Sequence, residues 1–305
     1  MKIKELTVGD IASCSMLYYD ASQEIACHAV CDYLQIDNLP IIGSFEYAER
    51  SNGEFEIKPV KSANSVNPYV RLLDLDLQDK LINSPHNVLF VDDGGFVSGV
   101  LHISDFNRNR VIQAIQHDML VFERSLRQFL LLNRVSNDDL VGFMKQKAGN
   151  REKREERYWG NQYDFFDSIL KGKGRISGPP LQSFMLSHLL DYSNSSISGK
   201  LFKTSLSVCL SDGKNHDARS IINKLRNDAM HAKDLIDKHH GLDLYSVNDI
   251  IDFYKRINVF IKYNEILQVQ ILKHDSHIRA VSLDNESKLK IIQFQYPNAI
   301  DYFLK

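Results

Sequence analysis

The feature that most constrains the fold of this chain is a change in its hydrophobic period near residue 111. From Val111 to Leu132, apolar residues recur at three- and four-residue spacing and form one side of a long amphipathic helix. The core-facing side of that helix comprises Ile112, Ile115, Met119, Phe122, Leu126, Phe129 and Leu130. Later segments keep the helical period, so residues 111–305 are predicted to form an all-α helical bundle.

Several further helices are predicted within this bundle. They cover 136–147, 150–170, 181–192, 200–210, 221–240 and 248–273. The helix that begins at Ile221 is expected to stop at Gly241, because glycine commonly follows the last turn of a helix. In the last helix the core-facing residues are Ile250, Phe253, Ile257, Phe260, Leu267 and Ile271. The segment 289–296 in the C-terminal tail fits either a strand or a helix.

The first 110 residues mix short helices and strands in an order that occurs twice. The first copy is predicted as a helix, a strand, a turn-rich link and a strand, at 22–34, 39–43, 51–53 and 55–60. The second copy has the same order, at 75–82, 87–91, 92–95 and 96–103. A unit that recurs after roughly 50–60 residues is an internal repeat. The sequence therefore predicts an α+β domain over 1–110, followed by the helical domain over 111–305.

This N-terminal half resembles a tandem pair of CBS domains, a family that commonly binds adenine nucleotides between its repeats. The resemblance is carried by residues 88–105. There the stretch Gly99-Val-Leu-His-Ile-Ser-Asp105 supplies the glycine and the aspartate of the family's ribose- and phosphate-contacting pattern. It implies that Asp105 contacts a ribose. His102 stands where the family has a hydroxyl, and Ser104 is the neighbouring hydroxyl. The alternative is a packing or dimerisation platform that binds no ligand.

A second constellation lies in the helix predicted from Ile221. Asn227 and His231 are four residues apart and share one helix face, and Arg226 lies on its flank. An arginine can hold a phosphate, and an imidazole can move a proton near neutral pH. These groups are the minimum set for cleaving RNA without a metal. The opposite, apolar face comprises Ile222, Leu225, Ala229, Ala232 and Ile236.

The segment Arg226-Asn-Asp-Ala-Met-His231 resembles the RX4–6H signature of the HEPN superfamily, whose members are all-helical and often ribonucleases. The resemblance implies a metal-independent endoribonuclease with no catalytic cofactor. His231 would be the general acid or base, Arg226 would hold the phosphate, and Asn227 would orient His231 or the substrate. Because the family pairs two motifs across a two-fold interface, a homodimer through the helical domain is expected, with Met230 as an interface contact. The alternative is an ordinary solvated helix face.

The combination of the two resemblances implies a regulated enzyme. ATP, ADP or AMP bound at Asp105 would control cleavage of RNA, in a toxin-like role in antiviral (phage) defence or stress-induced growth arrest. Family toxins that are modified by an antitoxin carry a tyrosine two places after the histidine. This chain has Lys233 there, so that mode of control is not expected. The alternative is a non-catalytic nucleotide-sensing regulator whose helical domain binds a protein or RNA partner.

The charge balance restricts how the chain could contact RNA. With a net charge of −2 it cannot coat nucleic acid by charge alone, so a local basic surface is required. One candidate is the glycine-rich loop 171–180, where Lys171, Lys173 and Arg175 are predicted phosphate contacts unless the loop is simply a flexible connection. It lacks the ending of a P-loop, so nucleotide hydrolysis is not expected there.

Two other charged segments have open interpretations. Arg151, Arg154 and Arg157 precede Tyr158 and Trp159, and this segment is either an exposed, salt-bridged helix face or an RNA contact. Glu123 and Arg124 are either a solvated pair or support for Arg226.

Compartment and metal content are inferred from what the sequence lacks. No apolar run reaches the length of a membrane span, and residues 1–7 lack the apolar core of a signal peptide, so we expect a cytoplasmic protein without a membrane partner. The cysteines are Cys14, Cys27, Cys31 and Cys209. Because no second pair completes a zinc site, buried free thiols are expected, with neither a disulfide nor a metal.

Overall fold

The computed structural model describes residues 2–13, 17–34, 36–84, 88–172, 180–197, 207–236 and 246–280. The chain forms two compact units. Unit 1 comprises Met1–Met119, Val208–His216 and Lys224–Asn258, and unit 2 comprises Leu120–Ser207, Asp217–Asn223 and Val259–Lys305. The chain therefore returns to unit 1 after it has entered unit 2, whereas the sequence predicts one boundary near residue 110. Two of the boundaries fall inside long helices, α4 (Asn109–Leu132) and α10 (Val247–Ala280).

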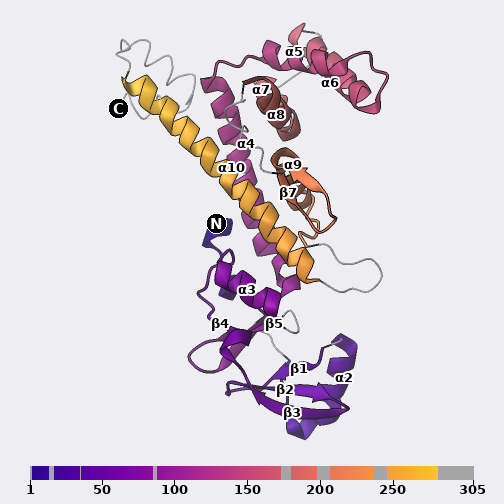
Figure 1. The fold of residues 1–305 in the computed structure, drawn as a ribbon, viewed down its shortest axis with the longest axis vertical. Helices are drawn as coiled ribbons and strands as arrows, with labels where there is room; N and C mark the ends of the chain where they lie inside the picture. The colour runs from indigo at the N-terminus through magenta and orange to yellow at the C-terminus, as the bar shows by residue number, and fades with distance from the viewer. Residues whose placement is uncertain are drawn as a thin grey trace. The chain divides into compact units, whose positions relative to one another are not determined.

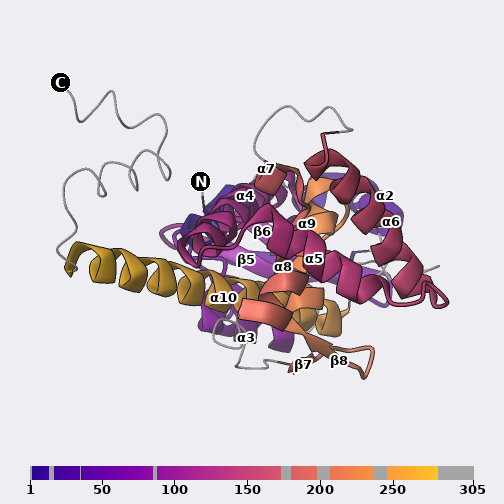
Figure 2. The same cartoon turned by 90° about the horizontal axis from the view of Figure 1, so that it is seen from above.

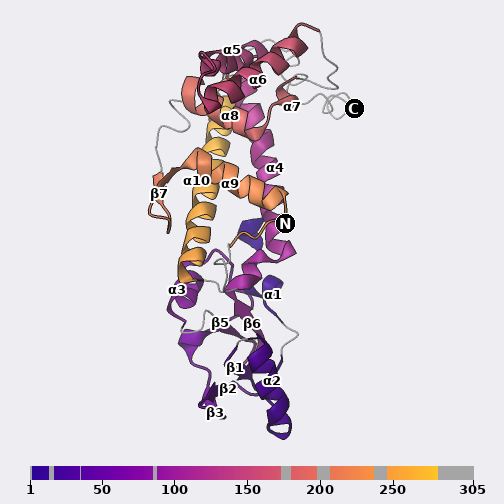
Figure 3. The ribbon, with the colours of Figure 1, turned by 90° about the vertical axis from the view of Figure 1, so that its right-hand side faces the viewer.

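The N-terminal part of unit 1 contains short helices and two small sheets, in agreement with the predicted α+β class (Figure 1). The helices are α1 (Val8–Ile11), α2 (Glu24–Leu34) and α3 (Leu75–Asn83). The strands are β1 (Asn38–Pro40), β2 (Glu46–Ser51), β3 (Glu54–Pro59), β4 (Ser65–Val66), β5 (Val88–Asp92) and β6 (Val97–His102). Strands β1, β2 and β3 form an antiparallel sheet beside α2, and β5 pairs with β4 in parallel and with β6 antiparallel (Figures 1 and 3).

The hairpin β5–β6 confirms the strand, turn and strand predicted at 87–103. Gly94 and Gly95 have φ angles of 74° and 93°, a left-handed conformation that most other residues avoid, so the tight turn depends on them. Along β6 buried and half-buried residues alternate, with Val97 and Leu101 facing the core. Strand β5 is buried at three consecutive positions, which explains its continuous apolar sequence.

A helix followed by an antiparallel strand pair does occur twice, as α2–β1–β2 and α3–β5–β6. The sequence prediction omitted β2 and paired the strands at 39–43 and 55–60 directly. In the structure β2 lies between them, and among its residues only Ala48 is fully buried. A strand with mostly polar, half-buried side chains gives no apolar alternation to recognise. The third strand also joins differently, since β3 adds antiparallel and β4 adds parallel.

The α/β part of unit 1 shares a core with the first turns of α10. Phe106, in the 3-10 turn η4 (Ile103–Asn107), is fully buried, and its ring centroid lies 5.3 Å from that of Phe253 and 5.9 Å from that of Tyr254. The Tyr254 hydroxyl donates to the Leu72 carbonyl at 2.7 Å. Residues separated by more than 140 positions therefore complete one hydrophobic core.

Unit 2 is helical. It contains α5 (Asn137–Ala148), α6 (Arg154–Leu170), α7 (Pro180–Ser183) and α8 (Leu186–Tyr192), with α5 and α6 side by side (Figure 2). The second halves of α4 and α10 also pack together here. The Phe122 and Phe260 rings meet edge to face at 5.6 Å, and Gln268 donates to the Ser125 hydroxyl at 2.8 Å. Every residue predicted on the core-facing sides of 111–132 and 248–273 is buried, so both helices are confirmed.

Some predictions about local structure were wrong or fall elsewhere. Residues 207–209, predicted as the end of a helix over 200–210, form strand β7 (Ser207–Cys209), which pairs with β8 (Asn215–Asp217), while 200–206 lie outside the described residues. The undecided segment 289–296 also lies outside them. Cys27 and Cys31 are buried free thiols as predicted, Cys209 is free but exposed, and Cys14 is outside the described ranges.

Among the helices that the structure describes, none combines the length and the apolar character that a bilayer crossing requires.

Candidate functional site

Helix α9 (Ala218–Met230) carries the Arg226–His231 segment. The helix begins after Asp217, whose carboxylate accepts a hydrogen bond of 2.7 Å from the Ser220 amide, as an N-capping aspartate does. Its inner face follows the prediction, because Ile222, Leu225 and Ala229 are fully buried. Arg226, Asn227 and Met230 are half-buried on the remaining surface.

The helix ends at Met230, so the prediction that it continues to His240 is wrong. The Lys233 amide donates to the Asp228 carbonyl at 2.9 Å, and the Ala232 amide donates to the Ala229 carbonyl at 3.1 Å. This pair of bonds is a Schellman motif, which requires a left-handed residue, and Ala232 has a φ of 49°. Ala232 is consequently exposed instead of continuing the apolar stripe, and Gly241 lies outside the described residues.

His231 directly follows Met230, the last residue of α9. The His231 amide donates to the Asn227 carbonyl at 3.1 Å, which is the hydrogen bond of an α-helix. Asn227 and His231 are therefore one helical turn apart, as the sequence predicts. The residue is exposed, and the structure therefore leaves it accessible to another molecule. Met230 beside it is half-buried.

Arg226 is held by its neighbour in the sequence. Its Nη1 donates to the Asn227 side-chain oxygen at 3.1 Å, so the Asn227 side chain contacts Arg226, and Asn227 meets His231 only through the backbone. The Nε of Arg226 is buried and has no hydrogen-bond partner within the described part of the chain. The half-buried Arg226 therefore lies on α9, five residues before the exposed His231.

Three side chains that sequence reasoning missed surround this helix end in unit 1. Gln116 donates to the Ala229 carbonyl at 2.7 Å. Asn107 bonds the backbone of Leu235 and Ile236, and Arg256 donates to the Leu235 carbonyl at 2.6 Å. No local pattern could have identified these residues, because each contacts a segment that is distant in the sequence.

The three residues predicted to bind nucleotide lie together at the start of η4. The Asp105 carboxylate accepts from the His102 amide at 2.8 Å and from Arg108 Nε at 2.7 Å, and His102 Nδ1 and the Ser104 hydroxyl share a hydrogen bond of 2.7 Å. Asp105 is 6% exposed, and burial raises the pKa of its carboxyl although these contacts oppose the shift. Burial lowers the pKa of His102. A ribose would have to open this network to reach Asp105.

The predicted phosphate-contacting residues are only partly described. Lys171 pairs with Asp167 at 2.7 Å, one turn earlier in α6, while Lys173 and Arg175 lie outside the described residues. Glu123 pairs with Arg127 at 2.6 Å, so it has a partner within α4 itself.

The charged segment at the start of α6 is partly engaged within the protein. Arg151 makes two bonds of 2.8 Å to the Asp164 carboxylate, which favours the exposed salt-bridged interpretation. Trp159 is only 3% exposed, and a residue buried in this way cannot stack on an RNA base. The alternative of an RNA contact therefore cannot include stacking on Trp159, whereas Arg154 and Arg157 are exposed.

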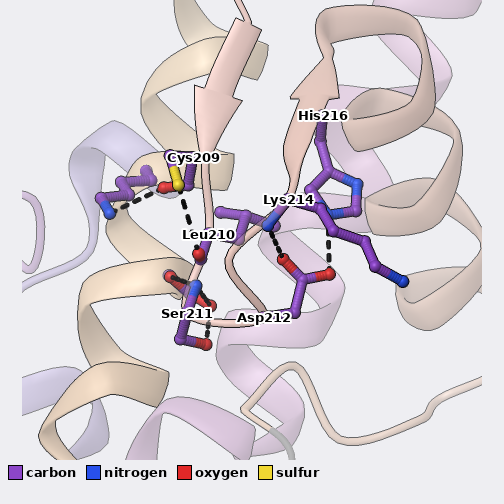
Figure 4. Close-up of polar contacts among 8 residues, drawn as sticks. Cys209, Leu210, Ser211, Asp212, Lys214 and His216 are labelled. Atoms are coloured by element: carbon purple, nitrogen blue, oxygen red, sulfur yellow. Dashed lines mark hydrogen bonds and ion pairs between the residues drawn. The ribbon is translucent and has the colours of Figure 1, made fainter.

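The β7–β8 hairpin precedes α9 and contains a compact set of polar contacts (Figure 4). Asp212 accepts from the Lys214 amide at 2.9 Å and pairs with His216 Nε2 at 2.9 Å, and these contacts lower the pKa of its carboxyl. Ser211 bonds Asp252 of α10, and Lys255 donates to the Cys209 carbonyl at 2.9 Å. Within the described ranges, no group of three or more His, Cys, Asp or Glu side chains is placed to hold a metal ion.

Comparisons with protein-family models, with curated proteins and with solved structures give no match to this chain.

Proposed function

We propose that the protein is a metal-independent endoribonuclease of the HEPN type, with Arg226 and His231 as its catalytic residues. The observation that supports the proposal best is the position of His231, exposed at the point where α9 ends and five residues after the half-buried Arg226. An imidazole enclosed by its own core could not reach a phosphodiester, and this one is accessible. Asn227 acts as a positioning residue, since its side-chain oxygen holds the Arg226 guanidinium.

The reaction is an internal transfer within RNA. The ribose 2′-oxygen attacks the adjacent phosphorus, the bond from phosphorus to the 5′-oxygen breaks, and a 2′,3′-cyclic phosphate and a 5′-hydroxyl remain. The 2′-hydroxyl proton passes to a base, and the departing 5′-oxygen takes a proton from an acid. His231 serves one of these steps, and His231 of a second copy serves the other. Arg226 stabilises the negative charge that grows on the phosphoryl oxygens.

The proposal includes control by an adenine nucleotide at the cluster of His102, Ser104 and Asp105. Its support is that these three side chains lie together, next to the Arg108 guanidinium, which could turn from Asp105 to a phosphate. A nucleotide that binds the native protein raises its melting temperature. We expect ATP, ADP or AMP to do so for the wild type and not for Asp105→Asn, measured by thermal shift; equal shifts in both would exclude this site.

Cleavage is tested directly with purified protein, total RNA and EDTA, in the presence and absence of ATP or AMP. We expect His231→Ala to reduce the rate by roughly 10²- to 10⁴-fold and Arg226→Ala by roughly 10²- to 10³-fold. Products of the wild type should accept a 5′ phosphate from polynucleotide kinase without prior phosphatase treatment, because their 5′ ends are free hydroxyls.

Two matched variants control for losses unrelated to chemistry. His216→Ala removes a histidine that pairs with Asp212, and Arg134→Ala removes an exposed arginine of unit 2. Both should cleave like the wild type. Equal cleavage rates for the wild type and all four variants would contradict the proposed ribonuclease activity and favour a non-catalytic regulator. So would a loss of cleavage in the two control variants only.

A further inference from the structure

The chain immediately after His231 is fixed by side chains from two other elements. Leu235 and Ile236 are buried although they lie outside any helix or strand, so their backbone polar groups need partners. The Asn107 side-chain oxygen accepts from the Leu235 amide at 2.7 Å and from the Ile236 amide at 2.9 Å, and its nitrogen donates to the Ile236 carbonyl at 3.0 Å. Arg256 satisfies the remaining group, the Leu235 carbonyl.

Asparagine is well suited to this position. Its side chain carries an acceptor and a donor on the same planar group, and both are used here. Aspartate would keep the acceptor but lose the donor, and alanine would lose both. Three backbone groups of a buried two-residue segment thus depend on one side chain.

The last turn of α9 is held as well. Gln116 of α4 donates to the Ala229 carbonyl, and Arg256 Nη1 lies 3.7 Å from the Asp228 carboxylate. Arg256 is 5% exposed, so this contact is made inside the protein. His231 therefore lies on a short stretch that is fixed on both sides, before it at Asp228 and Ala229 and after it at Leu235 and Ile236.

Asn107 is also the last residue of η4, the turn that begins with the His102–Asp105 network. Asp105 is bonded to Arg108, and Phe106 between Asp105 and Asn107 is fully buried against α10. Asp105 and Asn107 are thus two residues apart in one turn, on either side of a side chain that is packed without free space. The contacts of Asp105 and those of Asn107 are linked through this short, packed segment.

We infer that η4 couples the His102–Asp105 cluster to the proposed active site, with Asn107 as the positioning residue that sets the place of His231. The inference rests on the proposed function for its catalytic consequence. Binding of an anionic ligand that draws Arg108 away from Asp105 would release or tighten the segment after His231. Regulation would thus act within one subunit, through hydrogen bonds to Leu235 and Ile236.

The coupling is tested without RNA by native-state amide exchange of the full chain, followed by NMR at Leu235 and Ile236. Asn107→Ala should accelerate exchange at both amides by at least about tenfold, because their acceptor is lost. Arg108→Ala, a change at a half-exposed side chain, should do the same although Arg108 does not bond either residue. Asn133→Ala, which removes an asparagine that bonds Phe129 within α4, should leave both amides unchanged.

Unaltered exchange in Asn107→Ala would show that the Asn107 side chain does not hold Leu235 and Ile236. Unaltered exchange in Arg108→Ala alone would show that the segment Leu235–Ile236 is not coupled to Asp105. Either result overturns the inference. With RNA, Asn107→Asp should lower kcat by roughly ten- to a hundredfold and leave KM unchanged, as misplacement of a catalytic group does. If the wild type cleaves no RNA, the proposed function fails, and the exchange data still decide the coupling.

Discussion

His188 shows how strongly one residue of unit 2 depends on its surroundings. It is 1% exposed, its Nε2 shares a hydrogen bond of 2.9 Å with the Tyr158 hydroxyl, and its Nδ1 has no partner within the described residues. The rings of Trp159 and Phe166 lie 5.6 and 6.0 Å away. Burial in this apolar site lowers the pKa of His188 to about 4.

The lowered pKa predicts a loss of stability in mild acid. Between its unfolded pKa near 6.5 and about 4, the unfolded chain binds a proton that the native protein excludes. The free energy of unfolding should therefore fall as pH falls, by up to about 1.4 kcal/mol per pH unit. Urea titrations followed by fluorescence of Trp159, the single tryptophan, measure it.

His188→Gln is the control for this prediction, since it removes the titration and keeps a polar side chain. Burial raises the pKa of Asp191, although the nearby Arg219 opposes this shift. Asp191 therefore makes the free energy of unfolding depend on pH with the opposite sign, and it does so in both proteins. The difference in unfolding free energy between the two proteins should change between pH 7.5 and pH 5. A constant difference would contradict the buried, neutral imidazole.

At the scale of the element, the end of α9 decides where the proposed active site lies. The Schellman motif places Ala232 at a φ of 49°, and such a conformation costs a residue with a side chain about 1–2 kcal/mol. The helix stops there even though the sequence has alanine and not glycine. Packing of Leu235 and Ile236, which leave the helix to reach the core, offsets this cost.

Ala232→Gly should consequently stabilise the protein by roughly 0.5–1 kcal/mol, because glycine adopts the left-handed conformation freely. Ala229→Gly, three residues earlier and inside the helix, should destabilise it by about 1 kcal/mol or more, since the same substitution there only loosens the backbone. The melting temperatures of both variants measure these effects. If the helix instead continued past His231, Ala232→Gly would lower the melting temperature as Ala229→Gly does.

At the scale of the whole molecule, the N-terminal half depends on a helix that lies far away in the sequence. Phe106 is buried against Phe253 and Tyr254, and the Tyr254 hydroxyl bonds Leu72. Unit 1 therefore draws its core from residues 1–119 and from the first part of α10.

A fragment of residues 1–110 should not fold cooperatively, because it exposes Phe106 and leaves the Leu72 carbonyl without its partner. Loss of that aromatic burial alone removes about 2–3 kcal/mol. Amides of β5 and β6 should exchange much faster in the fragment than in the full chain, measured by hydrogen exchange. Phe253→Leu in the full chain should give an intermediate result. Equal protection in fragment and full chain would instead establish 1–110 as an independent domain.

Local sequence information was sufficient for elements whose apolar residues recur with a clear period. The helices over 111–132 and 248–273 and the hairpin at 87–103 are present, and the helix predicted from residue 136 is α5, which Ser136 and Asp139 cap. Local sequence information was insufficient where the spacing of apolar residues does not follow the secondary structure. Strand β2 is polar, and α9 stops within a run whose apolar spacing continues to Ile236.

For the candidate site, the sequence by itself determined which groups are available: an arginine, an asparagine and a histidine at helical spacing. Only the tertiary structure decided that the Asn227 side chain holds Arg226, that His231 ends its helix in an exposed turn, and that Asn107, Gln116 and Arg256 fix that turn. The physical reason is range. Helical periodicity is set by neighbours within one turn, whereas a buried backbone group is satisfied by whichever polar side chain the fold brings to it.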